Sequence, residues 1–306
     1  MLNKTKGIYL GVFSGVLWAV NTIVLTLIIS SENLKIFSVN LFIIPLTIAF
    51  FHDFFSAIIL FFNLKLKNIR IKIKRKLLFF LIFSSILGGP IGMASYLISS
   101  KFIGASYSSV ISIFYPIVGI LLDKIFFKAL ISKKQKISIC IAVLGIFILT
   151  FAKDNLFQYE NYILGIVFAI FCVFGWATEG VVASYSMKYG EVQSDIAIFI
   201  RQMTSAIFYL IFIIPYFSSI NLNIKIVNSY IVLILIFCGI IGSYSYLFWY
   251  KAIDFLGAPL GMSLNVMYVA WIALIEILFL NANFSFKFLI AISLVIFSIF
   301  YMSSEE

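Results

Sequence analysis

Long apolar runs separated by short polar linkers cover almost the whole chain. Each run approaches the ~20 mostly apolar residues that a helix needs to cross a bilayer. We therefore predict ten membrane-spanning helices, at roughly 7–29, 38–62, 77–98, 105–127, 135–152, 162–187, 196–217, 229–250, 258–280 and 285–303. The linkers leave no room for a soluble domain, so the predicted fold class is an all-α membrane protein.

Composition supports this class and excludes others. Of the 306 residues, 63% are hydrophobic and only 11% are charged, whereas soluble domains average about 25% charged residues. The net charge of +10 does not indicate nucleic-acid binding, because the cations lie in linkers between apolar runs. The three cysteines lie within apolar runs without metal-site or disulfide spacing, which favours packing roles.

The distribution of basic residues predicts the orientation. Lys65, Lys67, Arg70, Lys72, Lys74, Arg75 and Lys76 lie between the second and third spans, and Lys128, Lys133, Lys134 and Lys136 between the fourth and fifth. Cytoplasmic linkers carry the excess of Lys and Arg. With ten spans, both termini are then expected to be cytoplasmic, in a bacterial inner membrane.

The two halves of the sequence resemble each other. Matched segments are Trp18-Ala19 with Trp176-Ala177, Ser95-Tyr96-Leu97 with Ser245-Tyr246-Leu247, and Gly104-Ala105 with Gly257-Ala258. We predict two five-helix repeats, residues 1–152 and 162–306. Because five is odd, the second repeat enters the membrane from the opposite side. Inverted repeats are typical of transporters whose substrate site lies near mid-membrane, between the repeats.

These features resemble the drug/metabolite transporter superfamily, in its EamA-type branch. The shared features are five plus five spans, a Trp in the first and sixth helices, and Gly-Ala at the start of the fourth and ninth. The Gly-Glu pair that often ends those two helices is replaced by Lys128-Ala129 and Asn281-Ala282. More narrowly, the chain is similar to bacterial choline importers of this superfamily, in Gly88-Gly89-Pro90-Ile91-Gly92-Met93, Tyr115-Pro116, Trp176 with Glu179, and Ser245 to Ile253.

Glu179 is the strongest candidate for a functional residue. It is the only charged residue between Ile163 and Met187, and ionisable groups at membrane depth are costly and usually functional. Trp176, three residues earlier, shares its helix face. An aromatic face beside a carboxylate suits an organic cation. The bland alternatives are a protonated, hydrogen-bonded Glu179 and an interfacial belt of aromatic rings.

The predicted site is an aromatic cage gathered from both repeats. Its predicted substrate-binding residues are Trp18, Asn21, Tyr96, Tyr115, Trp176, Glu179, Tyr246, Trp249, Tyr250 and Tyr268. Predicted coupling or gate residues are His52, Asp53, Asp123 and Glu276. For Asp123 and Glu276, the alternative is an ion pair near the membrane surface. For His52 and Asp53, the alternative is pairing with the basic linker. Arg201 is expected either to extend its guanidinium to the cytoplasmic interface or to pair with Asp195 or Glu191.

The predicted function is secondary transport of a small organic cation, with choline uptake favoured, by alternating access. Either the membrane potential or protons supply the energy. An exporter of amino acids or other small amphipathic metabolites is the first alternative, and a membrane enzyme acting on lipid headgroups the second. The enzyme alternative would need a pair of catalytic residues, such as two carboxylates or a His with a nucleophile, which the sequence does not show. The sequence also has no nucleotide-binding, nucleophile or metal-site motif, so no cofactor is expected. The lipid bilayer is the expected partner, and a monomer and a homodimer both remain open.

Overall fold

The computed structural model describes residues 2–37, 40–128, 132–151, 159–217, 219–283 and 285–303, and these are helical without any strand. The helices are α1 (Leu2–Ile29), α2 (Ile43–Leu66), α3 (Arg75–Ile86), α4 (Ala94–Ser112), α5 (Tyr115–Phe127), α6 (Lys133–Phe151), α8 (Tyr162–Gly190), α9 (Ser194–Phe208), α10 (Ile214–Tyr216), α11 (Ile220–Val227), α12 (Ile231–Leu256), α13 (Ala258–Asn265), α14 (Tyr268–Phe279) and α15 (Phe286–Ser303), with the 3₁₀-helix η1 (Glu32–Phe37) and the π-helical turns η2 (Leu87–Met93) and η3 (Tyr209–Ile213). Ala129 and residue 152, where the first predicted repeat ends, lie outside the described residues.

Seven helical segments among the described residues are long and apolar enough to cross a membrane: Asn3–Ile29, Ile43–Leu66, Arg75–Ser112, Tyr162–Gly190, Ser194–Tyr216, Ile231–Leu256 and Ala258–Phe279. A shorter apolar helix covers Phe286–Ser298. The protein is therefore an all-helical, multi-pass membrane protein. The ten-span count stays a prediction, because the predicted third span and the start of the fourth fall within the continuous segment Arg75–Ser112.

Two glycine breaks interrupt the helices in the same way. Gly104 inside α4 has φ 76° and ψ 165°, and Gly257 between α12 and α13 has φ 83° and ψ 163°. This backbone region is essentially restricted to glycine. Each break is followed by one eight-residue helical stretch, 105–112 or Ala258–Asn265, and then by a new helix beginning at Tyr115 or Tyr268. The breaks explain the two Gly-Ala pairs in the sequence.

A left-handed residue follows each of these new helices. Lys128 has φ 55° after α5, and Asn281 has φ 53° after α14. Asn adopts this conformation more readily than most residues, and Lys does so at some cost. These are the two positions where the resemblance led us to expect glycine, and both adopt a left-handed conformation that glycine tolerates without strain.

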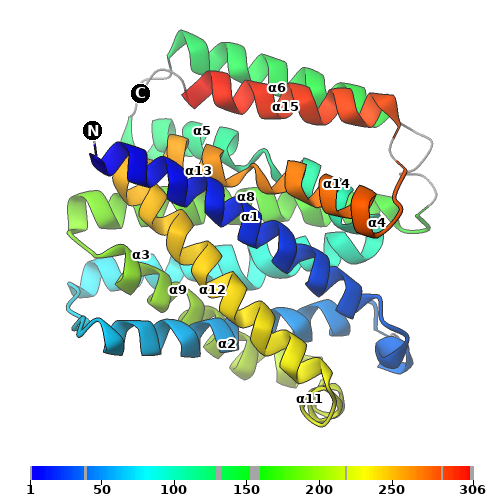
Figure 1. The fold of residues 1–306 in the computed structure, drawn as a ribbon. Coiled ribbons are helices and arrows are strands. Elements are labelled where there is room, and N and C mark those ends of the chain that lie inside the picture. Colours follow the sequence, from blue (N-terminus) through cyan, green and yellow to red (C-terminus); the bar gives the residue numbers. More distant parts are fainter. Residues whose placement is uncertain are drawn as a thin grey trace.

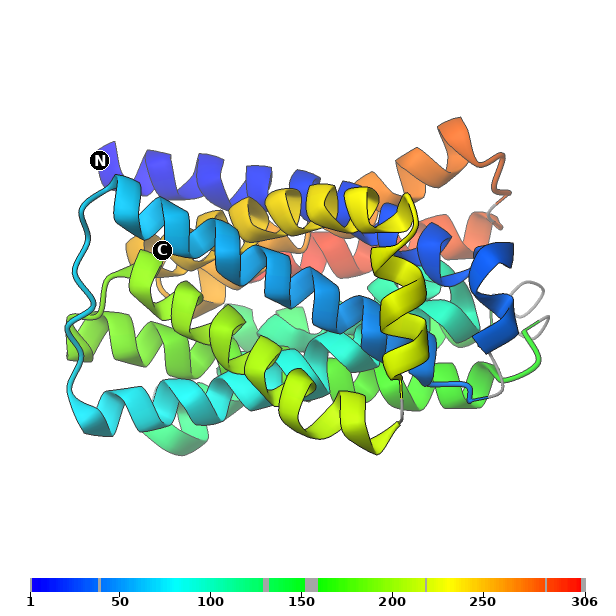
Figure 2. The same ribbon diagram turned by 90° about the horizontal axis from the view of Figure 1, so that it is seen from below.

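The helices pack around a centre formed by α1, α8 and α12. α1 lies along α12 and also contacts α13 and α14, while α8 lies along α4, η2 and α5. α6 and α15 form a separate pair at one edge, and the start of α1 lies at the same end of the bundle as the end of α15 (Figure 1). The view from below shows α2 and α9 on the opposite edge, with α12 close by (Figure 2).

Proline and glycine shape the turn η2. Pro90 lies inside this π-helical turn, where it lacks the N–H that a regular helical turn requires. A π turn absorbs such a defect within a continuous helix and often occurs at functional sites. The turn packs against α8, so it adjoins the helix that carries Trp176 and Glu179.

We predict that Gly257→Ala destabilises the protein through its backbone alone. A Cβ there has room, since its nearest neighbour is Pro259 Cδ at 3.9 Å, but the positive φ is unfavourable for alanine. The expected loss is ~1–3 kcal/mol in the free energy of unfolding, measured on protein purified in detergent. Gly119→Ala is the matched control, because that Cβ meets the flexible Met262 Sδ at 3.1 Å. Equal stability of the two variants would contradict the strain argument.

Candidate functional site

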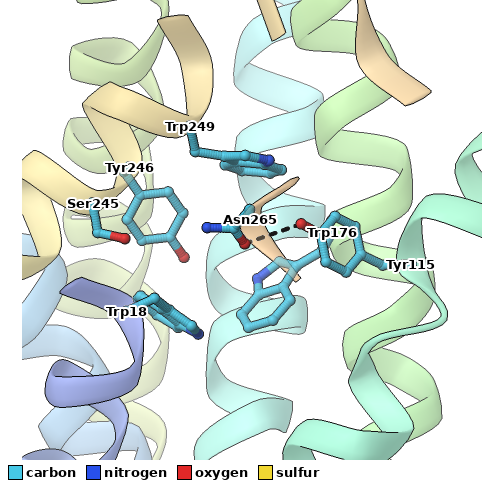
Figure 3. Close-up of a pocket in the computed structure, with 7 residues that line it drawn as sticks. All are labelled: Trp18, Tyr115, Trp176, Ser245, Tyr246, Trp249 and Asn265. Carbon is cyan, nitrogen blue, oxygen red and sulfur yellow. Dashed lines mark hydrogen bonds between the residues drawn. The ribbon is translucent and has the colours of Figure 1, made fainter. Parts of the chain in front are cut away.

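A central cavity is enclosed by side chains from five helices. Its free space is ≈ 20 Å³, room for about one water molecule, so its side chains are closely packed in this conformation. Its lining residues are Trp18, Tyr115, Trp176, Ser245, Tyr246, Trp249 and Asn265, and their side chains gather around one hollow (Figure 3). They come from α1, α5, α8, α12 and α13, so the chain must be fully folded for the cavity to exist.

The rings around the cavity meet largely edge to face. The ring of Trp18 lies 5.6 Å from that of Trp176 at 77° and 5.2 Å from that of Tyr246 at 72°. The rings of Tyr115 and Trp249 are 5.9 Å apart at 85°. In such contacts the positive edge of one ring meets the electron-rich face of another, which holds the rings against one another. The three tryptophans are each only 4% exposed, so these faces are shielded from water and lipid.

Asn265 and Tyr115 lock one wall of the cavity. The Tyr115 hydroxyl donates to Asn265 Oδ1 at 3.0 Å and to the Met262 carbonyl at 3.0 Å, while Asn265 Nδ2 donates to Ser14 Oγ at 2.9 Å. The first of these bonds is drawn in Figure 3. α5, α13 and α1 are thereby held together beside the cavity.

Five of the ten predicted binding residues line the cavity: Trp18, Tyr115, Trp176, Tyr246 and Trp249. Tyr96 and Tyr268 lie behind them, fully buried. The Tyr96 ring is 5.0 Å from that of Trp176, and its hydroxyl is 2.7 Å from Ser109 Oγ. The Tyr268 hydroxyl is 2.7 Å from Ser112 Oγ. The direct binding roles of these two tyrosines stay predictions.

Glu179 does not line the cavity and is paired with a buried cation. Arg201 Nε lies 3.0 Å from Glu179 Oε1, and the Tyr250 hydroxyl donates to the same oxygen at 2.8 Å. Arg201 Nη1 lies 3.1 Å from Asp53 Oδ2. The arginine is only 1% exposed and the two carboxylates are fully buried. One guanidinium therefore joins acids from α8 and α2.

The expectation that Arg201 lies at the cytoplasmic interface is wrong. Asp195 instead pairs with Lys67 at 2.5 Å and with Lys251 at 3.4 Å. The sequence already argued against a pair between Asp195 and Arg201, because they are six residues apart. On a helix, residues three or four apart share a face, whereas residues six apart do not. Arg201 was missed as a site residue because its two partners come from other helices.

Arg201 also connects the charges to the cavity wall. Its Nη2 donates to the Gly88 carbonyl at 3.0 Å and to the Tyr246 hydroxyl at 3.1 Å. The guanidinium carbon lies 4.5 Å from the centre of the Tyr246 ring. Because Tyr246 also lines the cavity, a single aromatic ring separates the hollow from the buried charges.

His52 and Asp53 extend this cluster toward α1. His52 Nδ1 lies 2.9 Å from Asp53 Oδ1, and Asn21 Nδ2 lies 3.1 Å from His52 Nε2. Ser205 donates a further hydrogen bond to Asp53. Both His52 and Asp53 are fully buried, so the alternative in which they pair with the basic linker is wrong. A role in coupling or gating stays a prediction.

The arrangement around Asn21 matches that around Glu179. Trp18 and Asn21 have the same spacing on α1 as Trp176 and Glu179 on α8. Asn21 contacts His52 on α2 and Glu179 contacts Arg201 on α9. Four residues further along, Ser56 donates to the Gly239 carbonyl at 3.1 Å, whereas Ser205 donates to Asp53. The first half thus has an amide–imidazole pair where the second has an ion pair.

Asp123 and Glu276 lie away from the cavity. Both are partly buried near the ends of α5 and α14. Glu276 accepts a hydrogen bond from Ser106, and Lys188 is close enough to Asp123 to act on its charge. Their gating role stays a prediction. Within the described ranges, no group of three His, Cys, Asp or Glu is placed to hold a metal ion.

Comparison with known proteins gives the family. The sequence model of the EamA-like transporter family matches residues 5–151 and 163–304. The chain belongs to the EamA-like transporter family. This EamA protein is also similar to "Protein LicB" of Haemophilus influenzae (strain ATCC 51907 / DSM 11121 / KW20 / Rd), with 30% identity over 190 residues, or 61% of this chain. The match spans 62% of the length of that relative.

A solved structure supports the fold. A protein described only as "Crystal structure of protein" superposes on this EamA chain with a TM-score of 0.68. The superposition covers 96% of this chain and 94% of the other, at 14% sequence identity. Similarity at this level shows the fold and leaves the substrate to be argued from the site.

We predict that Arg201→Gln strongly destabilises the protein. It leaves two buried carboxylates without their cation, and loss of one partner from a buried ion pair costs ~3–5 kcal/mol. Lys67→Gln is the control, since Lys67 is 40% exposed in its pair with Asp195 and exposed pairs contribute up to about 1 kcal/mol. Unfolding measurements in detergent compare the two. Adding Asp53→Asn to Arg201→Gln should recover part of the loss, and no recovery would show that charge imbalance is not the cause.

Proposed function

We propose that this EamA-family protein is a secondary transporter of the bacterial inner membrane that takes up a small organic cation, with choline as the favoured substrate. One observation carries the proposal: an aromatic cavity lies one ring away from a buried cluster with an excess of negative charge. The family description of transporter supports transport rather than catalysis. The choice of choline as substrate rests on the resemblance of the sequence motifs to choline importers and on the chemistry of the cavity.

The cluster next to the cavity favours a cation. Glu179 and Asp53 carry two negative charges when ionised, and Arg201 supplies one positive charge. When His52 is neutral, these three groups together carry a formal charge of −1. At low dielectric this excess acts over several ångströms, and each aromatic face adds ~0.5–2 kcal/mol of attraction for a cation. A cation in the cavity therefore offsets the charge imbalance.

The indole N–H groups favour a cation that also carries an oxygen. The Nε1 atoms of Trp18 and Trp176 are buried and have no hydrogen-bond partner among the described residues. Leaving a buried donor unpaired costs ~1–3 kcal/mol. The quaternary ammonium group of choline cannot accept a hydrogen bond, whereas its hydroxyl oxygen can. Both rings border the hollow (Figure 3), so a substrate admitted when the hollow widens would bring its hydroxyl within reach of these donors.

In the proposed mechanism, the chain crosses the membrane ten times with both termini cytoplasmic. Residues 1–152 and 162–306 form two inverted halves, an arrangement that permits alternating access. The equivalent breaks at Gly104 and Gly257 support related halves. So does the position of the start of α1 and the end of α15 at one end of the bundle (Figure 1). Rocking of the halves exposes the cavity to each side in turn, with Asp123 and Glu276 at the two mouths. Energy comes from the membrane potential, ~2.3 kcal/mol per charge at 100 mV, or from protons carried by Glu179 or His52-Asp53.

We predict that choline raises the unfolding temperature of the purified protein more than 3,3-dimethylbutanol does. This neutral alcohol has the shape of choline with carbon in place of nitrogen, so the comparison isolates the charge. Removing the cation–π attraction should weaken binding at least ~tenfold, which thermal shifts across ligand concentrations measure.

Glu179→Gln is the matched variant for this series. It keeps the Arg201–Asp53 pair, so the fold should persist, but it removes the excess negative charge and should abolish uptake of radiolabelled choline into proteoliposomes. Stabilisation by amino acids and not by choline would favour the exporter alternative. Equal binding of choline and its neutral analogue would refute the cation site.

We predict that Trp18→Phe narrows the preference for choline over tetramethylammonium. Phenylalanine keeps an aromatic face and loses the N–H donor. A hydrogen bond contributes about 0.5–1.5 kcal/mol, so the preference should fall roughly two- to tenfold in the same thermal assay. Phe13→Leu on the outer face of α1, where Phe13 is 51% exposed, is the control. A preserved preference in Trp18→Phe would assign the hydroxyl to another partner.

A further inference from the structure

A second, larger hollow opens on the outer surface between α3, α5 and α8. Its empty volume is ≈ 1050 Å³, and it shares no residue with the central cavity. Its lining residues are Lys76, Leu77, Phe80, Phe83, Leu122, Phe126, Thr178, Val181, Val182 and Tyr185. We call it the lateral groove. All of its lining is apolar apart from Lys76, Thr178 and the hydroxyl of Tyr185.

The lateral groove is elongated along the helices. On α3 it extends from Lys76 to Phe83 and on α8 from Tyr185 to Thr178, about 10 Å in each case at the rise of an α-helix. A Cβ on Gly190 would meet the Leu77 side chain at 2.6 Å, so the end of α8 lies beside the start of α3. The groove therefore has one end near Lys76 and continues inward between apolar walls. This shape suits a hydrocarbon chain.

Cations gather at the Lys76 end of the lateral groove. The exposed basic residues there come from all three helices and their ends: Arg75, Lys76, Lys124, Lys128 and Lys188. The same helix ends carry two acids, Asp123, on whose charge Lys188 acts, and Glu191. Five cations against two acids leave a net positive charge. This end also adjoins the basic linker that is predicted to face the cytoplasm, where the leaflet is anionic.

We propose that the lateral groove binds an anionic phospholipid, with one acyl chain between α3, α5 and α8 and the phosphate beside Arg75 and Lys76. The apolar walls account for the chain and the basic end accounts for the headgroup charge. A zwitterionic lipid satisfies only the first requirement. The bound chain contacts α3 and α5 from the first predicted half and α8 from the second. It therefore occupies the seam along which the halves move, independently of which substrate is carried.

The test measures lipid retention on the full-length protein. Delipidated protein in detergent is incubated with phosphatidylglycerol or with phosphatidylcholine of the same acyl chains, and native mass spectrometry counts the bound lipids. The wild-type protein should retain phosphatidylglycerol preferentially. Each basic residue near an anionic headgroup contributes about 1 kcal/mol, so Arg75→Gln with Lys76→Gln should weaken retention of phosphatidylglycerol by ~25-fold.

Two further variants separate charge from shape. Lys225→Gln with Lys287→Gln removes two exposed cations at the other end of the bundle, on α11 and at the start of α15 (Figure 1), and should leave retention unchanged. Val182→Trp fills the groove without altering charge and should reduce retention of both lipids. If this variant does not fold, the charge variants still decide the question.

Three results would overturn the proposal. Equal retention of the two lipids by the wild-type protein would remove the role of charge. Unchanged retention in the Arg75 and Lys76 variant would place the headgroup elsewhere. A lipid-free dimer that Val182→Trp converts to a monomer would show that a second copy of the chain occupies the groove.

Discussion

The structure depends on one buried guanidinium. Arg201 sits between Glu179 and Asp53 with almost no exposure, in a bilayer where an isolated charge is costly. Each of these charged groups lacks its partners, and is costly to bury, until α2, α8 and α9 have packed together. The same arginine also bonds the Gly88 carbonyl and the Tyr246 hydroxyl. The position of the cavity wall is thus tied to the pairing of the charges.

Because Glu179 lies behind the cavity wall, its negative charge acts on the cavity from a distance and not by direct contact. Glu179 does not line the hollow and is already paired with Arg201 and hydrogen-bonded by Tyr250. A ligand in the cavity therefore meets aromatic faces directly and senses the acids through the low dielectric between them. For the cation proposed as substrate, such an arrangement would give attraction without a tight ion pair, which would oppose its release.

The matched arrangements around Asn21 and Glu179 are chemically unequal. Asn21 with His52 forms a polar pair that is neutral unless the imidazole is protonated, whereas Glu179 with Arg201 is charged. Asp53 joins the two, since it contacts both His52 and Arg201. The glycine breaks, by contrast, are almost the same in both halves. The backbone is therefore repeated more closely than the charges that lie between the helices.

The sequence by itself determined the helical membrane class, because runs of apolar residues long enough to cross a bilayer have few other stable structures. It also indicated Trp18 and Trp176 as neighbours, since residues at equivalent positions of a repeat meet around a common axis. Only the tertiary structure decided that Arg201 pairs with Glu179 and Asp53, and that Glu179 lies behind the cavity rather than in it. Helical periodicity specifies which face a side chain occupies, but the partner on another helix depends on how far apart and at what angle the helices pack.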